Sequence, residues 1–151
     1  MSLAFSTGPL ENQVAGPVTS SAVVWTKVLN NSDCLSVQAT VKVFKLNGSK
    51  TLIQQSSLTV EPLASHYVTT NVASAFEFEV QIGISPREAV HDVLISVWGK
   101  DASGNLNPSH RLVPQELTPI PALTPTDDQV VWGSASERTT GDQPAPGEAG
   151  Q

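Results

Sequence analysis

The chain has 151 residues, 39% of them hydrophobic and 15% charged, and eight Lys or Arg against fourteen Asp or Glu give a formal net charge of −6. This length fits one domain with a tail, and the scattered basic residues form no cluster that could neutralise neighbouring phosphates, so nucleic-acid binding is disfavoured. The single cysteine, Cys34, excludes an intramolecular disulfide and a cysteine-only metal site.

Residues 1–17 are predicted to form an extended N-terminal arm. Gly8-Pro9 and Gly16-Pro17 are turn and extended-chain signals, so we expect a lead-in segment rather than a packed element, which could lie along the sandwich or reach a neighbour. The first residues carry no basic region and only a short apolar run, unlike a signal peptide, and no stretch is long enough to span a bilayer. We therefore expect a soluble protein that is made in the cytoplasm and does not insert into membranes.

Alternation of apolar and polar side chains predicts about seven strands. The pattern is clearest in Phe76–Ile84, where Phe76, Phe78, Val80, Ile82 and Ile84 share one face of an extended chain. The predicted strands cover residues 21–30, 35–46, 50–60, 66–72, 76–84, 90–100 and 106–113.

Local signals refine the fold class. Asn47-Gly48 favours a tight hairpin. The polar middle of residues 50–60 favours an edge position, and Pro108 within residues 106–113 favours an edge position or a bulge. We expect an all-β fold, with a single antiparallel sandwich over residues 18–120.

Residues 121–151 are predicted to be a disordered tail, because this Pro- and Gly-rich stretch offers too little apolar area to offset the entropy of ordering. Val130-Val131-Trp132 is the exception. It is interpreted either as a triplet that docks weakly on its own domain or as a motif that adds a strand to a partner's sheet edge.

No catalytic or metal-binding motif stands out. His66, His91 and His110 fall on separate predicted elements, and a zinc site would need three or four ligands in fixed geometry. Glu77 and Glu79 lie about 7 Å apart on one strand face, which is typical of a solvated face, with paired-carboxylate hydrolysis as the alternative. We expect neither enzymatic activity nor a cofactor.

Two further features are interpreted as structural. The run Asp101–Asn105 loosely resembles a calcium loop but lacks the distal bidentate Glu, so a hairpin turn is expected. Cys34 is expected to be a small apolar filler near a strand end, with an intermolecular cross-link as the alternative.

The aromatic residues carry the best functional hint. Trp98 has the opposite parity to Val93, Ile95 and Val97, and Trp25 shares a face with Lys27. Both indoles are therefore predicted to face outward, where they could anchor an interface or stack on sugar rings. The alternative is that they cap the sandwich ends or cover the N-terminal arm. The candidate interaction residues are Trp25, Tyr67, Trp98 and Trp132.

The segment Val93–Leu106, with its Asp-x-x-Gly-Asn turn, resembles the last hairpin of fibronectin type III and bacterial immunoglobulin-like domains. Leu29–Asp33, followed by an alternating strand and Asn47-Gly48, also resembles such domains. More loosely, residues 20–120 resemble small uncharacterised proteins of spore-forming Gram-positive bacteria. The resemblance implies an immunoglobulin-like sandwich used for adhesion or scaffolding rather than chemistry.

These features together predict a non-catalytic structural or protein-interaction module. It would contact other copies or a protein partner through an edge strand or exposed aromatic residues, and the spore-former resemblance implies a cell or spore envelope layer. A carbohydrate-binding module that uses its exposed tryptophans is the alternative.

Overall fold

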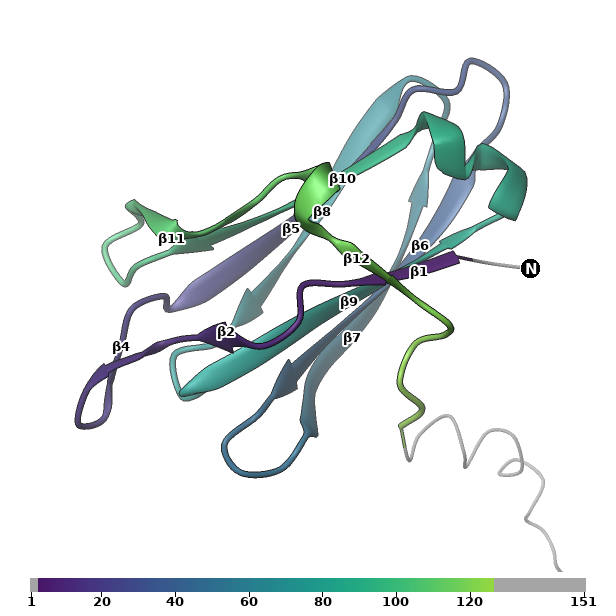
Figure 1. The fold of residues 1–151 in the computed structure, drawn as a ribbon. Helices are drawn as coiled ribbons and strands as arrows, with labels where there is room; N and C mark the ends of the chain where they lie inside the picture. The colour runs from purple at the N-terminus through teal and green to yellow at the C-terminus, as the bar shows by residue number, and fades with distance from the viewer. Residues whose placement is uncertain (1–2, 127–151) are drawn as a thin grey trace, which may run out of the picture.

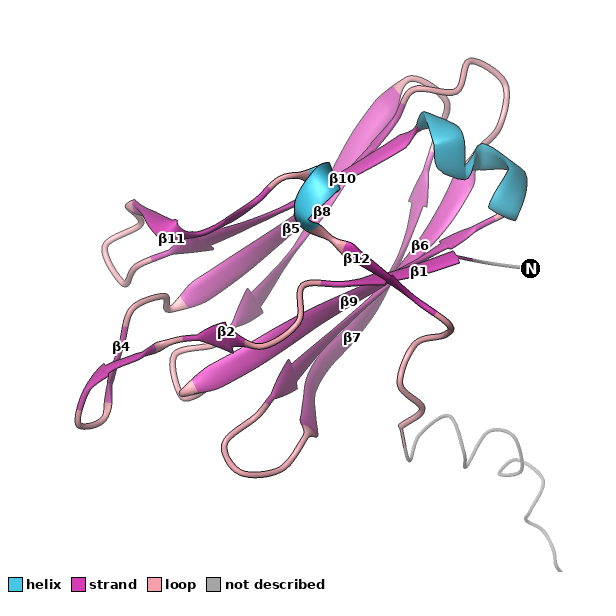
Figure 2. Cartoon of the chain, in the orientation of Figure 1, coloured by secondary structure: helices cyan, strands magenta, loops and turns pink. Residues whose placement is uncertain are grey.

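The computed structural model describes residues 3–126, which form two antiparallel β-sheets packed face to face (Figures 1 and 2). The larger sheet has the order β12 (Thr118–Ile120), β1 (Leu3–Ser6), β9 (Glu77–Ser85), β6 (Val37–Lys45) and β7 (Thr51–Val60), with β2 (Leu10–Glu11) also paired to β9. The smaller sheet has the order β11 (Leu106–Leu112), β10 (Val93–Lys100), β5 (Val23–Asn30) and β8 (Ala64–Asn71).

Short elements complete the fold. A small hairpin consists of β3 (Gln13–Ala15) and β4 (Val18–Thr19), and two 3₁₀ helices are η1 (Arg87–Asp92) and η2 (Pro114–Glu116). No helix among residues 3–126 is long and apolar enough to cross a membrane.

The all-β prediction is confirmed, and the seven predicted strands correspond to β5–β11. The predicted edge positions are correct for β7 and β11, each at the end of its sheet. The predicted strand over residues 90–100 starts only at Val93, because His91 and Asp92 belong to η1.

The hydrophobic core lies between the two sheets and is built from the alternating strand positions. Phe78, Val80, Ile82 and Ile84 of β9 have no exposed surface, whereas Phe76 precedes the strand and is half-buried. Val24 and Val28 of β5 face them from the smaller sheet. Local alternation thus decided which side of each strand became the interior.

The expectation of an unpacked N-terminal arm is wrong for Leu3–Ser6. These residues form β1, which lies between β9 and β12, and Phe5 packs against the core. The physical reason is that the chain crosses to the smaller sheet after β9, where β10 pairs with β5. The free edge of β9 is then completed by the arm, so that its backbone groups are hydrogen-bonded.

The start of the predicted tail also differs from expectation. Residues 121–126, which we call the strap, lie against the outer face of the larger sheet, where Leu123 contacts Gly83 and Thr124 bonds to Gln81. Residues 127–151, including Val130-Val131-Trp132, lie outside the described residues.

Candidate functional site

Three of the four candidate residues come together on the outer face of the smaller sheet. Trp98 of β10 is directly opposite Trp25 of β5, and the ring of Trp25 stacks on that of Tyr67 of β8 at 4.8 Å between centroids. Tyr67 is 50% exposed and the two indoles are half-buried. The predicted outward direction of both indoles agrees with this arrangement. Trp132, the fourth candidate, lies outside the described residues.

Three cationic side chains surround these rings. The ammonium nitrogen of Lys100 lies 4.0 Å from the ring centroid of Trp25. The ammonium nitrogen of Lys27 lies 5.4 Å from the ring centroids of both Trp25 and Tyr67. The Arg111 guanidinium lies 5.8 Å from the ring centroid of Trp98. Each distance is within the range of a cation–π contact. We call the six residues Trp25, Lys27, Tyr67, Trp98, Lys100 and Arg111 the aromatic face.

The smaller sheet has a charge bias that the whole chain lacks. Its four strands contain no Asp or Glu, although the chain carries a net charge of −6. The strands of this sheet thus carry cations and no carboxylate, a composition that favours an anionic ligand. This signal was present in the sequence, but it becomes visible only when β5, β8, β10 and β11 are known to be neighbours.

The Trp25 ring is poorly placed for stacking on a sugar. Lys100 reaches the Trp25 ring from β10, and Tyr67 reaches it from β8, and these strands flank β5 on opposite sides. Both faces of the Trp25 indole are thus already covered, whereas a sugar ring needs an open aromatic face. The indole nitrogen of Trp98 donates a hydrogen bond to Ser96 Oγ at 2.8 Å, which further orients this side chain.

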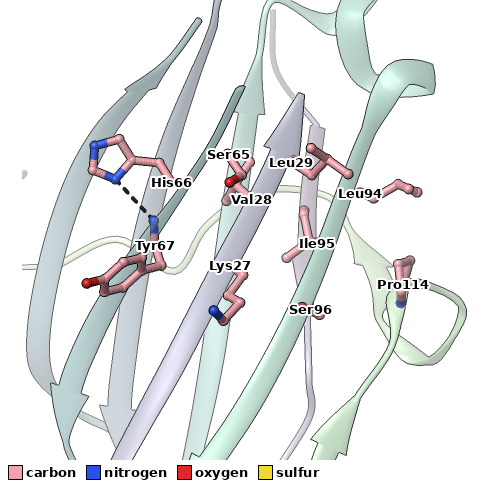
Figure 3. Close-up of a pocket in the computed structure, with 10 residues that line it drawn as sticks. All are labelled: Lys27, Val28, Leu29, Ser65, His66, Tyr67, Leu94, Ile95, Ser96 and Pro114. Atoms are coloured by element: carbon pink, nitrogen blue, oxygen red, sulfur yellow. Dashed lines mark hydrogen bonds between the residues drawn. The ribbon is translucent and has the colours of Figure 1, made fainter. Parts of the chain in front are cut away.

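A shallow groove of about 440 Å³ continues the aromatic face toward η2 (Figure 3). Lys27 and Tyr67 lie at one end, and Leu29, Leu94 and Pro114 line the other. Leu29 and Leu94 are each more than one third exposed, which is unusual for adjacent leucines on a sheet. The groove therefore offers an apolar floor beside a cation, and sequence analysis missed both leucines.

A β-bulge positions the edge of the aromatic face. The register between β10 and β11 shifts between Trp98 and Gly99, which places Arg111 opposite Trp98. Beneath the bulge, Gly99 leaves room for buried Ser21 and His110. The sequence signal for this feature was Pro108, which predicted an edge strand or a bulge.

Ser21 and His110 form a buried polar pair rather than an accessible nucleophile. Ser21 Oγ lies 2.7 Å from His110 Nδ1, and His110 Nε2 lies 2.7 Å from the Glu11 carbonyl oxygen. Because a carbonyl only accepts, Nε2 carries the proton and Nδ1 accepts the hydroxyl proton of Ser21. Both residues are at most 2% exposed, so a substrate could not reach them without local opening.

The remaining candidates are dispersed. His66 lines the groove, His91 lies in η1 and His110 is buried, and among residues 3–126 no three His, Cys, Asp or Glu side chains are grouped to hold a metal ion. Cys34 is exposed, so its interpretation as an apolar filler is wrong.

Asp101 closes its hairpin turn. The side chain accepts hydrogen bonds from the backbone N–H groups of Asn105 and Ser103, each at 2.9 Å. The bond from the Asn105 backbone is the main cause that lowers the pKa of Asp101 below its ordinary value. The Asp101 carboxylate therefore stabilises the hairpin turn that the sequence predicted.

Glu79 differs from its interpretation as part of a solvated face, and Lys42 of β6 is not solvated either. Lys42 is fully buried under the strap, its Nζ 2.7 Å from the Thr124 carbonyl oxygen, and burial lowers its pKa. Glu79 forms an ion pair of 2.8 Å with Lys50 and accepts hydrogen bonds from Ser6 and Gln81. Lys50 and Gln81 also donate hydrogen bonds to Thr124 Oγ1, so Glu79 belongs to the network that holds the strap on the sheet.

The pKa of Glu79 predicts an acid-dependent loss of stability. Burial alone would raise this pKa, but hydrogen bonds from Lys50, Ser6 and Gln81 and the charge of Lys50 together hold it below the ordinary 4.5. The unfolded chain therefore binds the proton more readily, so this stabilisation is present above pH 4.5 and is lost as the pH falls through the folded-state pKa.

Urea unfolding of the wild type and Glu79→Gln between pH 7 and pH 3 tests this linkage. We expect wild type to be more stable at pH 7 by about 1 kcal/mol, a value reduced for partial solvent screening. The difference should shrink below the ordinary pKa of 4.5. A difference that is constant with pH would contradict the assignment.

Comparisons with known proteins identify no family. No protein-family model matches the chain, and no curated protein matches it. The chain is similar to a solved structure described as "Crystal Structure of Thermotoga maritima 1070", with 10% identity over 79% of this chain and 89% of that one and a TM-score of 0.41. A likeness this distant identifies neither a family nor an activity.

Proposed function

We propose that the chain is a non-catalytic protein-interaction module whose docking surface is the aromatic face with its adjoining groove. The observation that carries this proposal is the convergence of Trp25, Tyr67 and Trp98 with three cations on a sheet whose strands contain no carboxylate. The partner that fits such a surface presents acidic side chains next to apolar ones.

The composition of this surface supports a protein partner. Trp, Tyr and Arg are the residues most enriched among those that dominate binding energy, and Asp and Glu are depleted in interface centres. Leu29 and Leu94 add an apolar floor, which gains free energy when a ligand removes it from water. The cations on the aromatic face would speed association with an acidic partner and select against a basic one.

We also propose that the sandwich is immunoglobulin-like, and the strand order supports this. β5 and β8 are neighbours in one sheet while β6 and β9 are neighbours in the other, as the B–E and C–F strand pairs are in immunoglobulin domains. The last strands depart from that pattern, since β10 pairs with β5 rather than with β9. The location in a cell or spore envelope layer stays a prediction, which immunogold labelling of the source cells would test.

A selection experiment tests the proposed docking surface. The full chain is used to select peptides from a random library displayed on phage. We expect the enriched peptides to combine Asp or Glu with aromatic or aliphatic residues, and Lys27→Glu to weaken their binding about tenfold, because it places like charges together.

The matched control is Lys45→Glu, which makes the same charge change at the end of β6 in the other sheet. This variant should keep full binding. Peptides without an acidic bias, or equal losses in the two variants, would contradict the proposed surface. A parallel glycan array reports on the carbohydrate alternative, for which Tyr67→Ala would abolish a signal.

A further inference from the structure

We propose that the segment Asp127–Trp132 of one copy docks on the aromatic face and groove of a second copy. This inference rests on the proposed function and names the partner: another molecule of the same chain. The segment has the sequence Asp-Asp-Gln-Val-Val-Trp and follows directly after the strap.

The chemistry of the segment matches that of the surface. Two adjacent carboxylates precede two valines and a tryptophan in the segment. On the surface, Lys27 lies between the exposed aromatic rings and the leucine-lined floor of the groove. In the docked segment the two carboxylates would pair with the cations of the aromatic face, and the Val-Val-Trp triplet would pack on the leucine-lined floor of the groove.

The position of Thr126 disfavours docking within one copy. Thr126 borders a second hollow together with Phe44, Thr51 and Leu52, on the outer side of the larger sheet at the start of β7. The groove lies on the outer side of the other sheet, at the level of Ser65 and Tyr67. Tyr67 lies midway along β8, and the Thr69 carbonyl of this strand accepts a hydrogen bond from Gln54 of β7 at 3.1 Å.

The path from Thr126 to this groove is about as long as the segment itself. From the start of β7 to the level of Tyr67 is roughly 15 Å at about 3.3 Å per residue, and passing around the two sheets adds about 10 Å. The six residues from Asp127 to Trp132 span at most about 20 Å when fully extended. The segment would therefore be used up before it could lie along the groove of its own chain, whereas a second copy can be approached freely.

The resulting contact is head-to-tail. The surface that donates the segment differs from the surface that receives it, so each copy can bind one neighbour on each side. Such a heterologous contact grows into open chains unless its rotation closes a ring. This geometry suits a protein with a structural role in an assembled layer.

Sedimentation velocity of the full chain from about 1 µM to 1 mM tests self-association. We expect species larger than a dimer at the upper concentrations, and weaker association at high salt. Trp132→Ala, and separately Asp127→Asn with Asp128→Asn, should each weaken association about tenfold or more. The double change Asp142→Asn with Glu148→Gln removes the same charge from the rest of the tail and should have no effect.

A mixing experiment distinguishes head-to-tail docking from other modes. Lys27→Glu blocks the receiving surface, and Trp132→Ala blocks the donated segment. At a concentration at which wild type just associates, each variant alone should stay monomeric, and an equimolar mixture should form heterodimers only, since one working groove meets one working segment. Circular dichroism of both variants confirms that they fold.

Three outcomes would overturn the inference. They are a chain that stays monomeric throughout, association of Trp132→Ala that is as strong as that of wild type, and mixed variants that fail to form heterodimers. The proposed function has an independent readout, because acidic-apolar peptides selected on phage would still bind wild type and not Lys27→Glu. If wild type bound neither the selected peptides nor a second copy, the proposed docking surface itself would be wrong.

Discussion

Gly99→Ala should lower the free energy of unfolding by about 3 kcal/mol. A Cβ atom at this position would lie 2.7 Å from His110 Cβ and would also clash with Ser21 Oγ. Overpacking a tight interior typically costs about 1–3 kcal/mol, and separating the buried Ser21–His110 pair adds a cost of similar size. Ser21 and His110 cannot move away from the new Cβ atom at the bulge, because each is fixed by a further hydrogen bond.

Urea unfolding followed by tryptophan fluorescence measures the effect of Gly99→Ala. The matched control is Gly83→Ala, also in a strand, where the new Cβ would meet only the flexible end of the Leu123 side chain at 3.0 Å. We expect the control to lose less than about 1 kcal/mol. Equal losses at both glycines would show that the packing under the bulge is not the cause.

Asn12→Ala should destabilise the fold by about 3 kcal/mol or more. The buried side chain of Asn12 accepts a hydrogen bond from the Ser21 N–H at 2.7 Å and donates to the carbonyls of Ser21, Val72 and Ala75. One amide thereby connects the N-terminal arm, the entry to β5 and the loop between β8 and β9. Its removal leaves several buried backbone groups without a partner, each worth about 1–3 kcal/mol.

The control for Asn12→Ala is Asn71→Ala in the same region of the molecule. The Asn71 side chain is exposed and accepts one hydrogen bond, from the Ala73 N–H at 2.9 Å. We expect this variant to lose less than about 1 kcal/mol, since water replaces the lost partner. Thermal unfolding of both variants by circular dichroism provides the measurement. A mild effect of Asn12→Ala would mean that ordered water replaces the amide.

The two predictions concern the same end of the molecule, where segments distant in sequence meet. Ser21 and His110 are separated by 89 positions, and Asn12 and Ala75 by 63. This polar cluster holds β11 and the N-terminal arm against the sandwich. The cluster also sets the register that places Arg111 beside Trp98, so stability and the docking surface depend on the same contacts.

The strands and their inward faces could be predicted from the sequence. The alternation in β9 identified Phe78, Val80, Ile82 and Ile84 as one face, and all four are buried. The same parity argument placed Trp25 and Trp98 outward. These predictions succeed because the direction of a strand side chain is a local property, set by the pleat and repeated every two residues.

The neighbours of each strand could not be predicted in this way. Parity placed both indoles on outer surfaces, but only the pairing of β10 with β5 makes Trp98 and Trp25 adjacent. Likewise Lys42 has the alternation of a solvated residue, and it is buried because residues 121–126 cross the sheet above it. No periodicity within a strand records what a segment more than eighty residues away will cover.

The sequence by itself determined the fold class, the approximate strand positions and the side of each strand that faces the core, because local backbone geometry and the hydrophobic effect act within a few residues. The tertiary structure alone decided that Leu3–Ser6 completes the larger sheet, that the strap covers Lys42 and that three aromatic residues share a carboxylate-free face. Those outcomes depend on which strands pair. That choice is a balance of backbone hydrogen bonding, loop closure and burial summed over the whole chain.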